Sequence, residues 1–247
     1  MQRSGDAGDC VVLIHGLGRT RLSLLGMQIW LRRRGYRVVN FAYPSRSLPV
    51  ADVVRDWLEP ALAVLDVAEG ARVHFVTHSL GGIVFRNWAM GRAADFPLGR
   101  VVMLAPPNYG SEIMDHIGGQ PWARLVLGPA VDELRTEAMS GADRLGAVPA
   151  ETAVIMGNRA KIRLFRHLLG PESDGIVSVR AGWLPGLAGF LVVPADHTFI
   201  MWRPLVLRAV GHFLAHGSFA ESPFTHYEAN PRFGGSDSGG SGIRSRA

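Results

Sequence analysis

The chain has 247 residues, of which 47% are hydrophobic and 19% charged, and its formal net charge is +5. This length suits a single α/β domain, and the composition supplies a hydrophobic core rather than a disordered chain. The longest uncharged apolar stretch, residues 181–195, contains Pro185 and is shorter than the roughly 18 residues of a membrane span, which argues against an integral membrane protein. Lys161 is the only lysine, and the arginines are scattered without a recognition motif, so no nucleic-acid partner is expected.

The N-terminus and the cysteine content bear on the location of the protein. Residues 1–6 contain no apolar run of the kind found in signal peptides. The single cysteine, Cys10, cannot form an internal disulfide, which fits a reducing compartment. The expected location is therefore the cytoplasm.

Short apolar runs rich in valine alternate with longer helical patterns. Runs of this kind are typical of strands covered on both faces, and we predict strands at residues 10–14, 37–42, 72–77, 100–105, 152–156 and 189–193. Apolar residues three and four positions apart predict helices at 20–33, 51–68, 80–93 and 200–215. This alternation requires parallel pairing through crossover helices, so we expect an α/β fold with a mostly parallel, doubly wound sheet.

The pattern predicts one globular domain over residues 9–219. Residues 106–149 interrupt the alternation with short helical patterns separated by Gly and Pro, and we interpret them as a small helical cap. Residues 220–247 are predicted to be a C-terminal extension, which from about residue 234 is rich in Gly and Ser and expected to be disordered.

A serine lies between a buried strand and a helix, in the sequence Thr77-His78-Ser79-Leu80-Gly81. A sharp turn of this kind needs small residues two positions on either side of the serine, here Thr77 and Gly81. The geometry exposes the Ser79 hydroxyl above the carboxyl edge of the sheet and at a helix N-terminus. Ser79 is therefore a candidate nucleophile, and the alternative is that it only caps the helix.

An acyl-transfer site also needs two backbone N–H groups that point to the oxygen of the tetrahedral intermediate. The first strand ends in His15-Gly16-Leu17, a turn that would present the Leu17 N–H. The Leu80 N–H, directly after the serine, would be the second donor of the oxyanion hole. The alternative is an ordinary glycine-rich turn.

A serine hydroxyl needs a neighbouring base, itself oriented by a carboxylate. His197 follows the last strand and precedes the final helix, and Asp174 lies in an Asp-Gly turn after the strand at 152–156. We take His197 as the base and Asp174 as the acid. Asp196 is an alternative acid, although it is adjacent to His197 and could not easily turn back to its ring; Glu172 is a weaker one.

Other histidines compete for the role of base. His78 is adjacent to the serine, but neighbouring side chains on a tight turn point apart. His15 is better placed to brace the oxyanion turn. His212 and His216 share a helix face and could bind a metal ion, but no third ligand pattern accompanies them, so no metal site is expected.

A further motif after the fourth strand, residues 106–111, is a Pro-rich turn that ends in Gly-Ser. The His-Gly turn, the serine turn, the Asp-Gly turn and His197-Thr198-Phe199 occur in this order along the chain. Together with the Pro-rich turn, they make the chain resemble the α/β hydrolases of the lipase/esterase type. The resemblance extends from Val11 to about Phe219. Thr77 stands where the family usually has glycine, and Asn108 stands where this branch often has histidine.

The resemblance implies a serine hydrolase without metal or cofactor that cleaves small-molecule or lipid carboxylic esters through an acyl-enzyme on Ser79. Tyr109, Met114 and Trp122 are the candidate substrate-binding residues, although such apolar positions are also those of a cap core. Acyl transfer or thioester cleavage would use the same residues, and a non-catalytic binding protein is the alternative from another class. Arginines and an apolar cap also suggest contact with a lipid surface.

Overall fold

The computed structural model describes residues 8–92, 94–139, 145, 148, 151–160 and 166–219. In this part of the chain six strands form one sheet, with the order β2-β1-β3-β4-β5-β6 and parallel pairing throughout. The strands are β1 (Cys10–Ile14), β2 (Arg37–Phe41), β3 (Val73–His78), β4 (Leu98–Leu104), β5 (Thr152–Gly157) and β6 (Gly189–Val193). The predicted α/β fold with a parallel sheet is confirmed, and the predicted strand ends differ from these by two residues at most.

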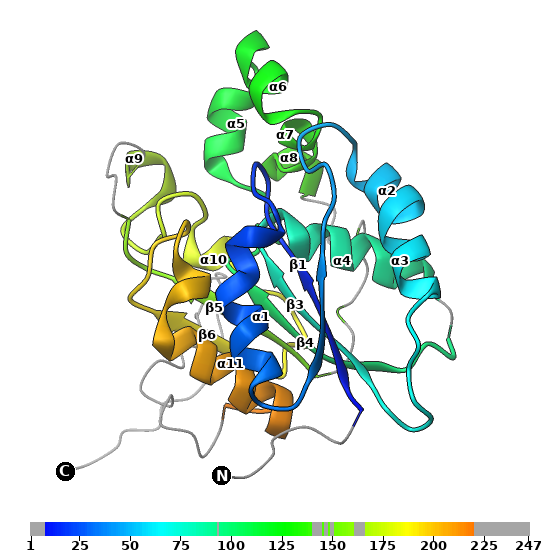
Figure 1. Cartoon of the computed structure of the whole chain (residues 1–247). Helices are drawn as coiled ribbons and strands as arrows, with labels where there is room; N and C mark the ends of the chain where they lie inside the picture. Colours follow the sequence, from blue (N-terminus) through cyan, green and yellow to red (C-terminus); the bar gives the residue numbers. More distant parts are fainter. Residues whose placement is uncertain are drawn as a thin grey trace, which may run out of the picture.

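Helices cover both faces of the sheet (Figure 1). One face carries the short turn η1 (Arg21–Leu24), α1 (Leu25–Arg32), η3 (Ile200–Trp202) and α11 (Pro204–His216). The other carries α2 (Val50–Val53), η2 (Val54–Leu58), α3 (Glu59–Ala63) and α4 (Leu80–Gly91). Within the described residues, no helix is both long and apolar enough to span a bilayer.

The helix predicted at 51–68 is shorter and less regular than expected. Its middle turn, η2, is a π-helix, and the helical segment ends at Ala63. Pro60 lies just beyond this turn, and it has no N–H to donate to the carbonyl four residues earlier, which favours a wider turn at this place.

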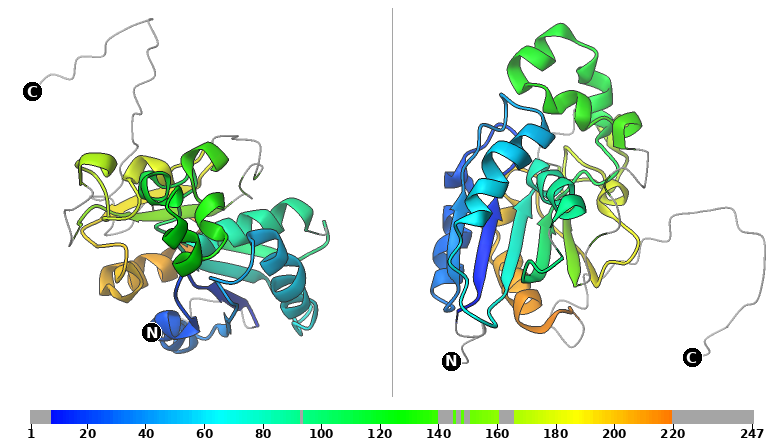
Figure 2. Two further views of the ribbon diagram at one scale, coloured as in Figure 1. Left: turned by 90° about the horizontal axis from the view of Figure 1, so that it is seen from above. Right: turned by 90° about the vertical axis from the view of Figure 1, so that its right-hand side faces the viewer.

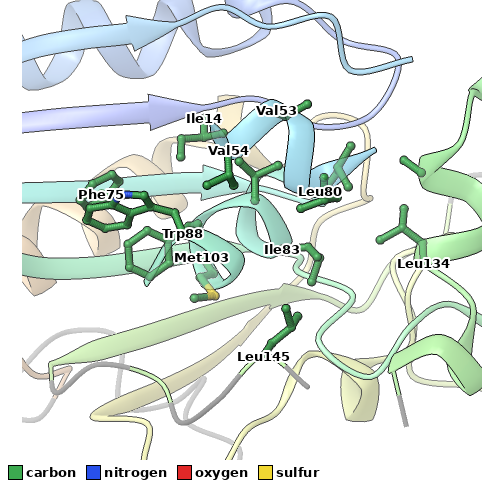
Figure 3. Close-up of a cluster of buried hydrophobic side chains, with 14 of the residues drawn as sticks. Ile14, Val53, Val54, Phe75, Leu80, Ile83, Trp88, Met103, Leu134 and Leu145 are labelled. Carbon is green, nitrogen blue, oxygen red and sulfur yellow. The ribbon is translucent and has the colours of Figure 1, made fainter. Parts of the chain in front are cut away.

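Alternating side chains of the strands bury both faces of the sheet. Val11 and Leu13 point to the face covered by α1 and α11, and Ile14 points to the opposite face. Figure 3 shows Ile14, Phe75 and other residues of this second core, which also receives side chains of α4. The two clusters pack against opposite faces of β1 and β3. These strands lead into the turns at His15-Gly16-Leu17 and at Ser79.

A helical cap lies between β4 and β5, in the region where the sequence predicts one. It consists of α5 (Glu112–Gly118), α6 (Pro121–Leu127), α7 (Ala130–Glu133) and α8 (Thr136–Met139). The cap stands beyond one end of the sheet, with α5 and α6 projecting farthest (Figure 2). Leu134 joins the core below, which anchors the cap to the sheet. Residues 220–247, predicted to be an extension, lie outside the described residues.

Two short helices follow in the second half of the chain: α9 (Arg166–Leu169) and α10 (Val179–Gly182). Both lie in the long connection between β5 and β6, which also contains the Asp174 turn. This connection therefore reaches the carboxyl end of the sheet, where parallel α/β folds place their sites.

Candidate active site

Three turns at the carboxyl ends of the strands bring together side chains that are far apart in the sequence. Ser79 follows β3, Asp174 lies beyond β5, and His197 follows β6. Because all strands are parallel, their carboxyl ends share one edge of the sheet. Topology alone thus places the three candidate catalytic residues on the same side of the molecule.

Ser79 occupies a strained backbone conformation between β3 and α4. Its φ of 52° and ψ of −123° are unusual for a residue other than glycine. The Ser79 N–H donates to the Leu104 carbonyl at 2.9 Å, and the Gly82 N–H donates to the Ser79 carbonyl at 2.8 Å. These bonds hold the serine at the tip of the turn, as the strand-serine-helix sequence predicts.

Gly81 is required because α4 passes very close to the end of β1. A Cβ atom built on Gly81 would lie 2.8 Å from the His15 carbonyl oxygen and still closer to the Ile14 carbonyl oxygen. We expect Gly81→Ala to lower the free energy of unfolding by about 1–3 kcal/mol, because helix and strand must move apart. Urea denaturation measures this difference. Gly91→Ala in the same helix is the matched control, since apart from its own helix backbone and chain neighbours no atom of the described residues lies within 4 Å of its added Cβ. An equal loss there would contradict the packing argument.

The candidate triad forms a continuous chain of hydrogen bonds. The Nε2 atom of His197 lies 3.0 Å from the Ser79 hydroxyl oxygen, and its Nδ1 atom lies 2.7 Å from Oδ2 of Asp174. Because Nδ1 faces a carboxylate, the proton of the neutral ring belongs there, and Nε2 is left to accept the serine proton. All three residues are buried, with Ser79 and His197 each 8% exposed.

The carboxylate of Asp174 is itself fixed by the backbone. Its Oδ1 accepts hydrogen bonds from the N–H groups of Ile176 at 3.0 Å and Val177 at 2.8 Å. The Asp174 carbonyl also accepts from the His197 N–H at 3.0 Å. The alternative acid, Asp196, instead accepts from the N–H groups that follow it in its own turn. The other alternative, Glu172, is exposed.

The two predicted oxyanion donors lie on turns that meet at Ser79. A Cβ atom on Gly16 would be 3.1 Å from Cβ of Ser79, so the turn that carries Leu17 packs directly against the serine. Leu80 is the first residue of α4. Neither the Leu17 nor the Leu80 N–H donates to an acceptor among the described residues, which leaves both able to bind an oxyanion.

His15 and Tyr43 brace the oxyanion turn. The rings stack with centroids 4.3 Å apart, and the Tyr43 hydroxyl donates to the His15 carbonyl at 2.7 Å. Burial lowers the pKa of His15 and raises that of Tyr43, so both rings are neutral near pH 7. The sequence indicates a bracing role for His15, but it gives no sign of Tyr43, which comes from the loop after β2.

His78, directly before Ser79 in the chain, contacts the segment that carries His197. Its Nε2 donates to the backbone carbonyl of His197 at 3.0 Å, and the two rings lie 5.1 Å apart. This contact cannot be predicted from the sequence, which only disfavours His78 as the base, because the fold alone brings β3 and the loop after β6 together.

Asn108 ties the turn after β4 to the segment beyond Asp174. Its Nδ2 donates to the Gly182 carbonyl at 2.8 Å, and its own carbonyl lies 3.4 Å from Nη1 of Arg86. Burial lowers the pKa of Arg86 to about 10, which still leaves it charged. At the position where this branch often has histidine, asparagine therefore has a structural role.

The three candidate substrate-binding residues are not brought together. Tyr109 lines a pocket of about 530 Å³ between α5, α8 and α10, together with Trp183. Met114 is packed in the core at 8% exposure, whereas Trp122 is 52% exposed on α6. Apolar spacing alone does not distinguish these three environments.

His212 and His216 stack on α11 with ring centroids 4.3 Å apart. No group of three metal-binding side chains occurs in the described part of the chain. Burial, followed by the nearby His216, lowers the pKa of His212. Their geometry is that of neighbouring residues on one helix face.

Comparisons with known proteins agree with this fold. A family model described as the alpha/beta hydrolase family matches residues 11–229, so the chain belongs to this family, and a hydrolase is supported. A search of curated proteins finds no match.

Solved structures of similar fold include several ester hydrolases. The mature form of a lipase from Bacillus licheniformis has a TM-score of 0.70 at 21% identity, covering 85% of this chain and 93% of that one. A phospholipase from Legionella pneumophila gives 0.63 at 19% identity, covering 86% and 60%. A metagenomic carboxyl esterase gives 0.60 at 21% identity, covering 77% and 65%. At these identities the likeness shows the fold.

Proposed function

We propose that this protein is a serine hydrolase that cleaves carboxylic esters through an acyl-enzyme on Ser79. The observation that carries the proposal is the hydrogen-bond chain from Ser79 through His197 to Asp174, with bonds of 3.0 and 2.7 Å. The N–H groups of Leu17 and Leu80, which have no acceptor among the described residues, support it, because acyl transfer needs stabilisation of an oxyanion.

In the proposed reaction the Ser79 oxygen attacks the acyl carbon while His197 Nε2 takes the hydroxyl proton. The Leu17 and Leu80 N–H groups bind the negative oxygen of the tetrahedral intermediate. The ester C–O bond then breaks, and His197 returns its proton to the departing alcohol oxygen. A water molecule, deprotonated by His197, next attacks the acyl-enzyme and releases the carboxylic acid and the Ser79 hydroxyl. The Asp174 side chain stabilises the imidazolium.

The proposed place for the apolar part of the substrate is the pocket beside Tyr109. The lining from Tyr109, Ala181 and Trp183 suits an apolar group, and Glu112, Asp115, Thr136 and Arg180 complete the lining. The pocket lies between the turn that follows β4 and the segment that follows Asp174, both of which reach the carboxyl end of the sheet. Met114 and Trp122 would then act in packing and at the surface, respectively.

The exposed face of α6 supports contact with a lipid surface. Trp122, Leu125 and Val126 are three and four positions apart and 52%, 87% and 49% exposed, while Ala123 between them is fully buried. The helix projects at the catalytic end of the sheet (Figure 2). Tryptophan and leucine on an exposed helix face favour the boundary of a lipid layer.

We expect Leu125→Asp to weaken co-sedimentation with phosphatidylcholine–phosphatidylglycerol vesicles by about tenfold, because a buried leucine contributes about 1.5–3 kcal/mol. Val64→Asp is the matched control, since Val64 is 81% exposed at the end of α3, away from the cap. Measurement at two salt concentrations separates the apolar contribution from the attraction of the +5 chain to anionic lipid. Equal loss in both variants would exclude a specific contact through α6.

The proposed activity is tested with p-nitrophenyl esters from acetyl to palmitoyl, in parallel with a fluorophosphonate that labels activated serines. Hydrolysis together with a label on the peptide that contains Ser79 is the expected result, and the chain-length optimum separates an esterase from a lipase. Product formed only when an alcohol or thiol acceptor is added would indicate acyl transfer. If the protein is folded but shows neither hydrolysis nor labelling, these results would favour a non-catalytic binding protein.

A further inference from the structure

His78 connects the nucleophile turn to the loop that carries the base. It is the last residue of β3, directly before Ser79, and is only 1% exposed. Its Nε2–H donates to the backbone carbonyl of His197, 119 residues away, at 3.0 Å. Among the described residues this is the only hydrogen bond that the carbonyl receives.

The other side of the His78 ring faces the oxyanion turn. A Cβ atom built on Gly16 would lie 2.9 Å from Nδ1 of His78, so ring and turn are in close contact. Burial, followed by the charge that His197 carries when protonated, lowers the pKa of His78 well below its ordinary value. The ring is therefore neutral near pH 7, with its proton on Nε2 where the acceptor lies.

The backbone of His197 is held from both directions. Its N–H donates to the Asp174 carbonyl at 3.0 Å, and its carbonyl accepts from His78. If the second bond is lost, the peptide that follows His197 can rotate, and the imidazole can shift relative to the serine oxygen. A misplacement of about 1 Å is enough to lower a rate about 100-fold.

We propose that His78 is a positioning residue for His197: its hydrogen bond to the His197 carbonyl sets the distance from the imidazole Nε2 to the Ser79 hydroxyl. The proposal rests on the proposed function, because it takes His197 as the base. His78 itself neither touches the substrate nor exchanges the reaction proton. Its neutrality matters as well, since the rings are 5.1 Å apart and a second positive charge there would oppose the imidazolium.

Three variants separate the hydrogen bond from the volume of the side chain. His78→Gln keeps an amide N–H near the position of Nε2, whereas His78→Asn carries the same group one methylene shorter and does not reach the carbonyl. His78→Phe fills the space without a donor. We expect kcat to fall about 10- to 100-fold in the Asn and Phe variants with KM nearly unchanged, and to recover largely in the Gln variant.

A second measurement does not depend on turnover. The proton between His197 Nδ1 and Asp174 lies in a short hydrogen bond and should give a low-field proton NMR signal. We expect this signal to shift or broaden in His78→Asn and His78→Phe and to return in His78→Gln. Circular dichroism and thermal melting establish whether each variant is folded. If the Phe variant does not fold, the comparison of the Asn and Gln variants tests the proposal.

The outcomes for the two proposals differ. If the wild-type protein cleaves esters and the Asn variant matches it in kcat and in the His197 signal, the positioning role is wrong while the proposed function stands. If the wild-type protein cleaves no ester, the proposed function fails, and the NMR comparison alone decides whether His78 positions His197. Equal loss in the Gln, Asn and Phe variants would assign His78 a packing role and overturn the proposal.

Discussion

Replacement of Ser79 by alanine is expected to lower kcat/KM for any ester substrate by at least about 10⁴-fold. In the proposed mechanism the variant loses the oxygen that bonds to the acyl carbon, and His197 and Asp174 then have no nucleophile to activate. Only the proposed stabilisation of the oxyanion by the Leu17 and Leu80 N–H groups would remain, acting on an attacking water molecule. Progress curves with a p-nitrophenyl ester at high enzyme concentration measure the residual rate.

The fold should survive this substitution. Alanine keeps the Cβ atom of serine, so the strained φ of 52° at the turn costs the same in both proteins. The Ser79 side chain accepts no bond from the helix, and α4 loses no cap. Unchanged thermal melting is therefore the control for the activity loss. A Ser79→Ala protein that still hydrolyses esters or still reacts with the fluorophosphonate would place the nucleophile elsewhere.

Asp174→Asn is expected to lower kcat by about 10³- to 10⁴-fold with little change in KM. Two backbone N–H groups, of Ile176 and Val177, point at Oδ1 and require an oxygen there. The amide nitrogen must then take the position of Oδ2, facing His197 Nδ1. Nδ1 becomes the acceptor, the ring proton moves to Nε2, and the base can no longer accept the serine proton.

The neighbouring aspartate provides the comparison for this prediction. Asp196 also accepts two backbone N–H bonds, from Thr198 and Phe199, whereas it is Oδ2 of Asp174 that lies 2.7 Å from Nδ1 of the His197 ring. Asp196→Asn should cost far less activity than Asp174→Asn when kcat is measured side by side. The opposite order would identify Asp196 as the acid and reverse the assignment of the two carboxylates.

The parts of this fold that the sequence predicts well depend on local patterns. Valine-rich runs indicate buried parallel strands, and the small residues around Ser79 indicate a sharp turn, so both are visible in short windows. The order of serine, aspartate and histidine adds a long-range constraint, because parallel strands end at one edge. These features were sufficient to predict the sheet and to select the residues that the structure brings together.

Other features depend on which surfaces meet, and no short window contains that information. Met114 and Trp122 have similar local patterns, yet one is in the core and the other on the surface. No sequence pattern points to the contacts of Tyr43 and His78, because these contacts involve residues 28 and 119 positions away. Because every residue has a backbone carbonyl, the type of the accepting residue does not indicate such a hydrogen bond.

The sheet order also has a consequence during synthesis of the chain. Ser79 directly follows β3, a strand near the middle of the sheet, whereas His197 follows β6, the strand at one edge. A ribosome-bound chain therefore contains the serine turn, with Leu80, and the turn that carries Leu17 long before the histidine is made. If the proposed mechanism holds, the nascent protein stays inert until the last strand has been added, and a protease cut before residue 197 would silence the mature protein without touching its nucleophile.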